Sequence, residues 1–230
     1  QQGCMSLKNT IETIQHKIES AQKRGGHDHP VQLIAVTKTH PFSLIQKCYE
    51  AGIEAIGENR TQEATQKFET FELMPSLTKR FIGHLQTNKI NSCLELFDTI
   101  DSVDSVRLAQ KISSKAKALN KTLPILLEVN TSGEAQKHGF TPKQRKEMLS
   151  CLEKPNIRTT GLMTVGPRTK NKKQIRKAFV ELRNLRDSIN KELGKTVLKD
   201  LSMGMSKDYE IAAEEGSTMV RIGTALFGKR

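Results

Sequence analysis

Eight short apolar segments alternate with helical segments along most of this chain, and that alternation restricts the fold more than any other feature. The segments are rich in Val, Ile and Leu, which is typical of strands buried on both faces. They lie at 33–38, 54–59, 79–84, 97–102, 123–130, 157–164, 197–204 and 219–223. Strand–helix alternation indicates parallel βαβ units, and eight units close into a (β/α)8 barrel of the TIM type, an α/β fold.

The main alternative to a barrel is an open, doubly wound sheet. Such sheets ordinarily carry a glycine-rich phosphate loop after the first strand, whereas residues 37–40 contain no glycine. An amphipathic helix over residues 6–24 precedes the first strand and lies outside the repeat. We therefore predict a single domain over residues 1–230, with an N-terminal helix and loop at 1–30 and the barrel at 31–230.

The chain carries a formal net charge of +12, which raises the question of a nucleic-acid partner. In its most basic stretch, residues 167–199, apolar residues recur at helical spacing, so the Lys and Arg residues lie on the outer face of an amphipathic helix. The chain has no Trp and only two Tyr residues, and therefore offers few aromatic rings to stack bases. We expect a solvated helix face and no specific nucleic-acid site.

Cysteine usage and hydropathy bear on the compartment. No apolar run approaches the roughly 18 residues that span a bilayer, and the first residues contain no signal-peptide hydrophobic region. The cysteines are widely separated and form no CxxC pair; they are Cys4, Cys48, Cys93 and Cys151. This pattern indicates neither a zinc knuckle nor a disulfide scaffold. We expect a cytoplasmic protein with no membrane partner.

Lys38 ends the first predicted strand. Strand alternation places it on the same face as Ile34 and Val36, so its side chain would leave the apolar face of a core strand. Removal of water from an ammonium group favours the neutral amine, which is a nucleophile toward aldehydes. The alternative is that Lys38 extends its charged end into solvent from the end of the strand.

Two turns rich in small residues follow the seventh and eighth predicted strands, a position where TIM barrels frequently bind phosphate. They are SMGMS at 202–206 and RIGT at 221–224. Small residues let the backbone approach an anion, Ser206 and Thr224 add hydroxyl donors, and Ser206 is placed to cap the following helix. Arg221 would point inward beneath this site and would need a ring nitrogen or a carboxylate as its partner. The alternative is that both turns are purely structural.

A Schiff-base lysine and a phosphate site in one barrel mouth leave two ligand classes, a sugar phosphate and pyridoxal 5'-phosphate (PLP). The chain also resembles a known family, the pyridoxal phosphate homeostasis proteins. The motifs that carry the resemblance are AVTKTH, AIGEN, FIGHLQTNK, TIDSVDS, LEVNTSGE, KHGF, GLMTVGP and LSMGMSKDYEIAAEEGSTMVRIGTALFG. The similarity covers nearly all of residues 33–228 and implies a barrel related to the N-terminal domain of alanine racemase.

The resemblance implies that PLP, as cofactor, is held as a Schiff base on Lys38. It also implies phosphate contacts from Ser206, Gly223 and Thr224, and a position for Arg221 near the pyridine nitrogen. An arginine there would keep that nitrogen unprotonated and so make the ring a poor electron sink. The further pocket walls that the resemblance implies are Asn59, His84, Met163 and Met203.

Several positions remain outside this interpretation. Arg60 stands where the family usually has Tyr, and Lys79-Arg80 stand where it usually has an aromatic residue and His, so positive charge would be added near the rim. His27 and His29 flank Asp28 in an HxH pattern, which alone is a weak metal signal. We predict no metal site.

An enzyme and a carrier are the two functional alternatives. Racemisation needs a proton donor on each face of the substrate carbanion, commonly a lysine and a tyrosine. In alanine racemases the tyrosine comes from an added β domain of the partner subunit, and this chain ends seven residues after its last predicted strand. We therefore predict no catalytic residues and a monomeric PLP carrier in vitamin B6 homeostasis that serves apo forms of PLP-dependent enzymes. A PLP-dependent amino-acid racemase is the alternative.

Overall fold

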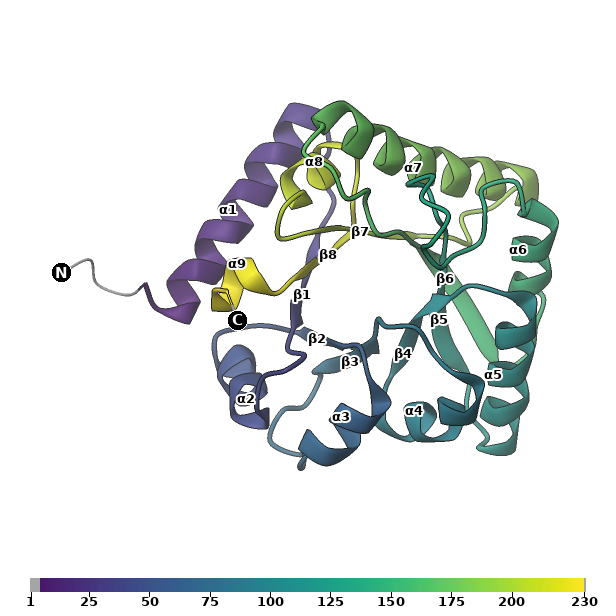
Figure 1. Cartoon of the computed structure of the whole chain (residues 1–230), viewed down its shortest axis with the longest axis horizontal. Coiled ribbons are helices and arrows are strands. Elements are labelled where there is room, and N and C mark those ends of the chain that lie inside the picture. The colour runs from purple at the N-terminus through teal and green to yellow at the C-terminus, as the bar shows by residue number, and fades with distance from the viewer. Residues whose placement is uncertain (1–4, 230) are drawn as a thin grey trace.

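The computed structural model describes residues 5–229, and within that range eight parallel strands form a closed barrel in sequence order. The strands are β1 (Gln32–Val36), β2 (Ala55–Glu58), β3 (Thr78–Phe81), β4 (Thr99–Val103), β5 (Leu123–Glu128), β6 (Ile157–Met163), β7 (Asp200–Met205) and β8 (Met219–Ile222). The pairing of β1 with β8 closes the barrel. Helices surround the strands on the outside, as Figure 1 shows. The predicted (β/α)8 barrel is confirmed.

The helices of the described residues match the predicted alternation, with three differences. They are α1 (Leu7–Gly25), α2 (Phe42–Glu50), α3 (Thr61–Lys67), α4 (Ile90–Leu96), α5 (Val106–Ala118), α6 (Arg145–Leu152), α7 (Lys172–Leu193), α8 (Tyr209–Glu214) and α9 (Thr224–Phe227), with a 3-10 turn at Thr87–Lys89. The short helices α4 and α9 were not predicted. Helix α6 begins later than Thr141 and Pro142, because Gln144 closes a turn on Thr141 through its backbone N–H and its Oε1.

Helix α1 covers one side of the barrel, as predicted for the N-terminal helix. Ser6 Oγ accepts a hydrogen bond from Asn9 N at 3.2 Å, and Gly26 ends the helix in the left-handed region with φ of 76°. Its buried apolar side chains pack against the strands and against α8, beside which α1 runs in Figure 1. A Cβ at Gly25 would lie 1.9 Å from the Glu214 backbone oxygen, so this crossing requires glycine.

The core has an inner and an outer part. The side chains of Ile34, Ala55, Leu126, Met163 and Met219 form an apolar cluster inside the barrel. Larger clusters lie between the strands and the helices. The outer layer includes the thiols of Cys48, Cys93 and Cys151, which are buried and unbonded, and burial raises the pKa of Cys48 to about 12. Cys4 lies outside the described residues.

Some charged side chains of the basic helix α7 form ion pairs with neighbouring helices. Arg176 and Arg183 pair with Glu215 at 3.0 and 2.8 Å, next to α8. Arg145 on α6 pairs with Glu192 on α7 at 3.1 Å. These arginines tie neighbouring helices together, which agrees with a structural interpretation of the basic stretch. Within residues 5–229, no helix combines the length and apolar character that a membrane crossing requires.

The expectation that Lys79 and Arg80 add charge near the rim is wrong. The Lys79 ammonium lies over the Phe71 ring, 4.5 Å from its centroid. The Arg80 guanidinium turns into the barrel and contacts both carboxylate oxygens of buried Asp101, at 3.1 and 3.2 Å. Thr99, the first residue of β4, hydrogen-bonds to the same carboxylate. Strand alternation directs the two adjacent side chains to opposite faces, and the contacts of Lys79 with Phe71 and of Arg80 with Thr99 and Asp101 hold both away from the mouth.

Candidate functional site

Lys38 lies in a turn just after β1. The strand ends at Val36, and the N–H of His40 donates to the carbonyl of Thr37 at 3.0 Å, so the predicted alternation stops two residues before the lysine. Lys38 is half-buried, and Thr39 beyond it has φ of 67°. Few side chains adopt this left-handed backbone, so something nearby must hold the turn in place.

A buried ion pair contacts the turn at residues 37–40, which follows β1. Glu58, the last residue of β2, is fully buried and pairs with Lys67 from α3. Glu58 Oε1 also accepts a hydrogen bond from Thr37 Oγ1 at 2.7 Å, and Lys67 Nζ donates to the Thr37 carbonyl at 3.0 Å. Burial raises the pKa of Glu58, and the contacts with Lys67 and Thr37 oppose that rise. The residue before Lys38 is therefore held by two charged groups.

The predicted phosphate turns meet at the ends of β7 and β8. Ser206 Oγ accepts hydrogen bonds from the backbone N–H groups of Gly223 at 3.3 Å and Ala225 at 3.1 Å. Thr224 is exposed beside them. A Cβ at Gly223 would lie 3.6 Å from Val36 Cβ, so this turn lies next to the end of β1. Two N–H groups and two hydroxyls thus gather close to the strand that leads into Lys38.

The predicted capping role of Ser206 is wrong. Helix α8 begins after Asp208, not after Ser206, and the Ser206 hydroxyl faces the first turn of α9 instead. The backbone turns between the two residues, because Asp208 Oδ1 accepts a hydrogen bond from Met205 N at 2.7 Å. The hydroxyl therefore links the β7 turn to the β8 turn.

Arg221 points into the barrel, as predicted from the alternation of β8. It is 4% exposed, and its guanidinium donates to Ser202 Oγ at 2.7 Å and to the Thr164 carbonyl at 2.8 Å. The predicted partner was a ring nitrogen or a carboxylate, whereas these direct partners are a hydroxyl and a carbonyl. Burial lowers the pKa of Arg221, and the charges of Glu128 and Asp208 oppose that change.

Glu128 is a charged residue of the mouth that the sequence analysis missed. It ends β5, and burial raises its pKa to about 7, with Arg221 lowering and Asp104 raising it. It lines a cavity of about 280 Å³ together with Lys137 and His138. A carboxylate inside the apolar run LPILLEVN is the available signal, but the predicted strand extends to Asn130, whereas β5 ends at Glu128.

The other residues predicted to line the pocket do not all lie in the barrel interior or at its mouth. The Asn59 side chain has a buried Oδ1 without a hydrogen-bond partner among the described residues, and Met163 lies in the inner cluster. Met203 is fully buried in the outer core with Phe179 and Ala212, because its neighbour Ser202 faces inward. The structure therefore brings Asn59 and Met163 to the barrel interior or mouth and places Met203 between the sheet and the helices.

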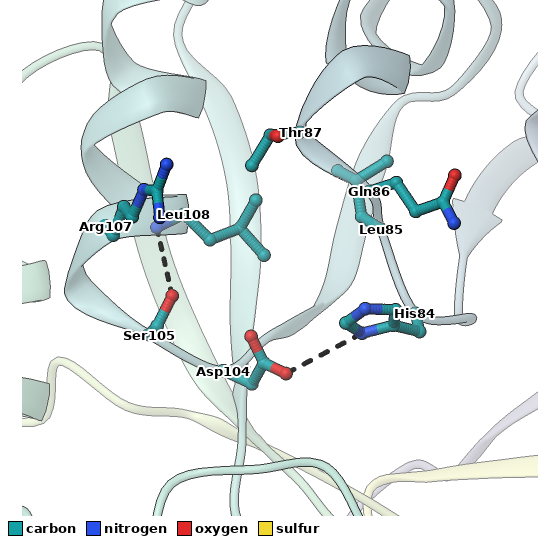
Figure 2. A pocket seen from close by; sticks show the side chains of 8 residues that line it. All are labelled: His84, Leu85, Gln86, Thr87, Asp104, Ser105, Arg107 and Leu108. Carbon is teal, nitrogen blue, oxygen red and sulfur yellow. Dashed lines mark hydrogen bonds and ion pairs between the residues drawn. The ribbon is translucent and has the colours of Figure 1, made fainter.

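His84 lies on the exposed rim. Its Nδ1 is 3.8 Å from Asp104 Oδ2, and its ring stacks on that of His138 with centroids 4.0 Å apart. Figure 2 shows the His84 ring facing Asp104 across a pocket of about 260 Å³. A second cavity, of about 380 Å³, lies on the other side of His84 and includes Arg60. Arg60 thus adds positive charge at the rim, as expected.

Comparisons with known proteins place this chain in a family. The family model "Alanine racemase, N-terminal domain" matches residues 10–230. The pyridoxal phosphate homeostasis protein of Aquifex aeolicus is 40% identical over 99% of this chain and 98% of its own length. That of Bos taurus is 33% identical over 96% of this chain and 86% of its own length. The chain belongs to the pyridoxal phosphate homeostasis protein family.

Solved structures agree with membership of the pyridoxal phosphate homeostasis protein family. PipY of Synechococcus elongatus with PLP bound has a TM-score of 0.84 and 31% identity, covering 97% of this chain and 100% of PipY. Alanine racemase of Clostridium difficile has a TM-score of 0.75 at 18% identity, covering 96% of this chain and 57% of the racemase. The second likeness shows a shared barrel fold.

Proposed function

We propose that this protein binds PLP at the barrel mouth, holds it as a Schiff base on Lys38, and stores or delivers it in vitamin B6 homeostasis without dedicated catalysis. The observation that carries the proposal is the cluster of N–H and hydroxyl groups around Ser206 and Gly223, next to the strand that leads into Lys38. The names of the relatives and the PLP-bound PipY structure support the same ligand.

The residues present fit PLP. The hydroxyls of Ser206 and Thr224 suit a phosphate, which accepts hydrogen bonds from many donors. The N–H groups of Gly223 and Ala225 donate to Ser206 Oγ in this structure and would turn from that oxygen to the phosphate on binding. The unpartnered buried oxygen of Asn59 is a polar atom at the mouth that a ligand can satisfy. The guanidinium of Arg221, which cannot serve as an acid, suits an unprotonated ring nitrogen.

The chain's own residues would position the ligand and limit its reactivity. PLP supplies a reactive aldehyde and, in enzymes, a ring that accepts electron density. Lys38 Nζ provides the amine for attachment, and the Glu58–Lys67 pair keeps its turn in place. Arg221 stays protonated, since guanidinium groups do not deprotonate in proteins, and would donate one hydrogen bond to the pyridine ring nitrogen of PLP.

The two tyrosines support a carrier over a racemase. Tyr49 lies on α2, outside the barrel, and its hydroxyl donates to the Pro75 carbonyl at 3.1 Å. Tyr209 is buried in the outer core, in the same apolar cluster as the buried residues of α1. Neither tyrosine is a proton donor in the barrel mouth. We therefore propose a non-catalytic carrier, and further propose that it acts as a cytoplasmic monomer that passes PLP to apo enzymes.

The decisive experiment identifies the attachment site. The purified protein is incubated with PLP, reduced with borohydride and digested, and we expect the cofactor mass on the peptide that contains Lys38. Lys38→Ala should lose both this mass and the near-visible absorption band, whereas Lys117→Ala, on the exposed face of α5, should keep both. Cofactor mass on other lysines in the unmodified protein, with none on Lys38, would refute the proposal.

A further inference from the structure

Three side chains able to bind a metal ion converge at the barrel mouth from three different loops. His84 follows β3, Asp104 lies between β4 and α5, and His138 lies in the loop after β5. The two Nδ1 atoms are 3.8 and 3.9 Å from the same oxygen, Asp104 Oδ2. Within residues 5–229 the three candidate ligand atoms lie within 4.8 Å of one another. Figure 2 shows Asp104 directed toward His84.

The backbone that carries each ligand is restrained. The aspartate directly precedes Ser105, whose hydroxyl caps the first turn of α5. A Cβ at Gly83 would lie 2.1 Å from the Asn59 carbonyl oxygen, so the chain before His84 packs tightly on the neighbouring loop. A Cβ at Gly139 would lie 2.6 Å from Asn130 N, which fixes the chain after His138 in the same way. The side chains therefore meet on positions that the fold defines.

We propose that His84, Asp104 and His138 bind one divalent transition-metal ion of the Zn²⁺ class. Two imidazole nitrogens and one carboxylate oxygen are ligands that such ions favour, whereas Mg²⁺ and Ca²⁺ prefer oxygen ligands alone. Three protein ligands leave at least one coordination position for water or another small ligand. The proposal replaces the prediction of no metal site, which rested on sequence spacing and could not detect ligands from three loops.

The Asp104 carboxylate supplies the negative charge of the proposed site, and both histidines are accessible. The Asp104 side chain is only 16% exposed, so its carboxylate is partly shielded from water and gains from a cation bound to it. Both imidazoles remain accessible to an incoming ion, since their side chains are 47% and 57% exposed.

Binding requires a small rearrangement. Zinc–ligand bonds of about 2.0–2.1 Å place tetrahedral ligands about 3.4 Å apart, so each Nδ1 atom must move roughly half an ångström closer to Asp104 Oδ2. The imidazole planes are 10° from parallel, and each ring must turn so that both Nδ1 lone pairs point at the ion. Exposed side chains rotate readily, and we expect metal binding to unstack the two rings.

Zinc binding is measured on the untagged full-length protein after dialysis against EDTA and removal of the chelator, by competition with a chromogenic chelator. We expect one Zn²⁺ per chain and a rise in melting temperature on binding. His138→Gln and Asp104→Asn should each weaken binding by at least about 10-fold, since changes that merely reorient ligands already cost that much. Co²⁺ should give visible absorption bands that both variants lose.

The matched control is the double variant His27→Gln, His29→Gln, which removes two neighbouring histidines whose ring centroids are 5.6 Å apart. It should bind zinc as the unmodified protein does. Equal affinity in the unmodified protein and in His138→Gln and Asp104→Asn would overturn the proposal, as would loss of binding in the control. Because PLP itself binds metal ions, all proteins are compared at the same cofactor content, and the binding of PLP to Lys38 is judged separately by borohydride labelling.

Discussion

Arg221 and Glu128 place opposite charges inside the barrel mouth, and burial acts on each of them. Arg221 is anchored by Ser202 and by the Thr164 carbonyl, so its charge has direct partners. Burial dominates at Glu128 and raises its pKa to about 7, despite the attraction of Arg221. The mouth thus contains a carboxyl group that gains or loses a proton near neutral pH.

Protonation of Glu128 should make the free energy of unfolding depend on pH. The carboxyl of Glu128 titrates near 4.5 when unfolded and about 7 when folded, so the folded protein binds one more proton between these values. Its contribution to stability is full below pH 4.5 and is lost as pH rises to about 7. The unfolding free energy of Glu128→Gln, measured with urea, is compared with that of the unmodified protein at pH 5.5 and at pH 8. The difference should shift by about 2 kcal/mol in favour of the variant from the lower to the higher pH. A difference that does not vary with pH would contradict this assignment.

The Ser206 hydroxyl allows a test of whether the two turns after β7 and β8 bind the phosphate of PLP. Its oxygen links the two turns through the N–H groups of Gly223 and Ala225. Ser206→Ala should raise the Kd for PLP about 10-fold, which is the loss of one charge-assisted hydrogen bond, measured by absorbance titration. Ser188→Ala, exposed on α7, is the control and should leave the Kd unchanged. An unchanged Kd in Ser206→Ala would exclude the hydroxyl from ligand binding.

Residues near the mouth were predictable where chain order alone determines their position. Arg221 and Gly223 follow from the alternation of one strand and its order in the barrel, and the structure confirms the inward arginine. The capping role of Ser206 failed because it depends on where a short helix begins, which Asp208 decides. The His84–Asp104–His138 cluster joins three loops, and sequence spacing carries no information on such a contact.

At the level of elements, strands and long helices were easier to predict than short helices. The apolar periodicity of α1, α5 and α7 spans three or more turns and identified each of them. Helices α4 and α9 have 7 and 4 residues, too few for a periodic pattern to emerge. The strand ends were predicted too late at β1 and β3. After β3 the apolar residue Ile82 continues the run, whereas after β1 the polar residues Thr37 and Lys38 already belong to a turn.

The contact of α3 with the β1–α2 turn predicts a coupling between elements. Lys67→Met removes the partner of Glu58, whose side chain is fully buried, and should cost about 3 kcal/mol of unfolding free energy at pH 8. The cost should shrink at low pH, where Glu58 takes up a proton, and Glu58→Gln added to Lys67→Met should restore much of the loss. The exposed Lys47→Met on α2 is the control.

The same variants separate stability from positioning. Because Glu58 and Lys67 hold Thr37, which precedes Lys38, the loss of Lys67 should also lower the fraction of Lys38 labelled by PLP and borohydride at subsaturating PLP. Full labelling in a destabilised Lys67→Met protein would show that the pair supports the fold without positioning the lysine.

For the whole molecule, the placement of both tyrosines away from the barrel mouth predicts that the protein does not racemise amino acids. Racemisation requires a proton carrier on each face of the Cα carbanion, commonly a lysine and a tyrosine, and both tyrosines lie outside the barrel mouth. In deuterated water, the PLP-loaded protein should exchange the Cα proton of free amino acids no faster than PLP alone at the same concentration, measured by proton NMR. A positioned acid or base commonly contributes 10²–10⁴-fold. An exchange rate about 100-fold above that of free PLP, lost in Lys38→Ala, would establish the racemase-type alternative and contradict the carrier.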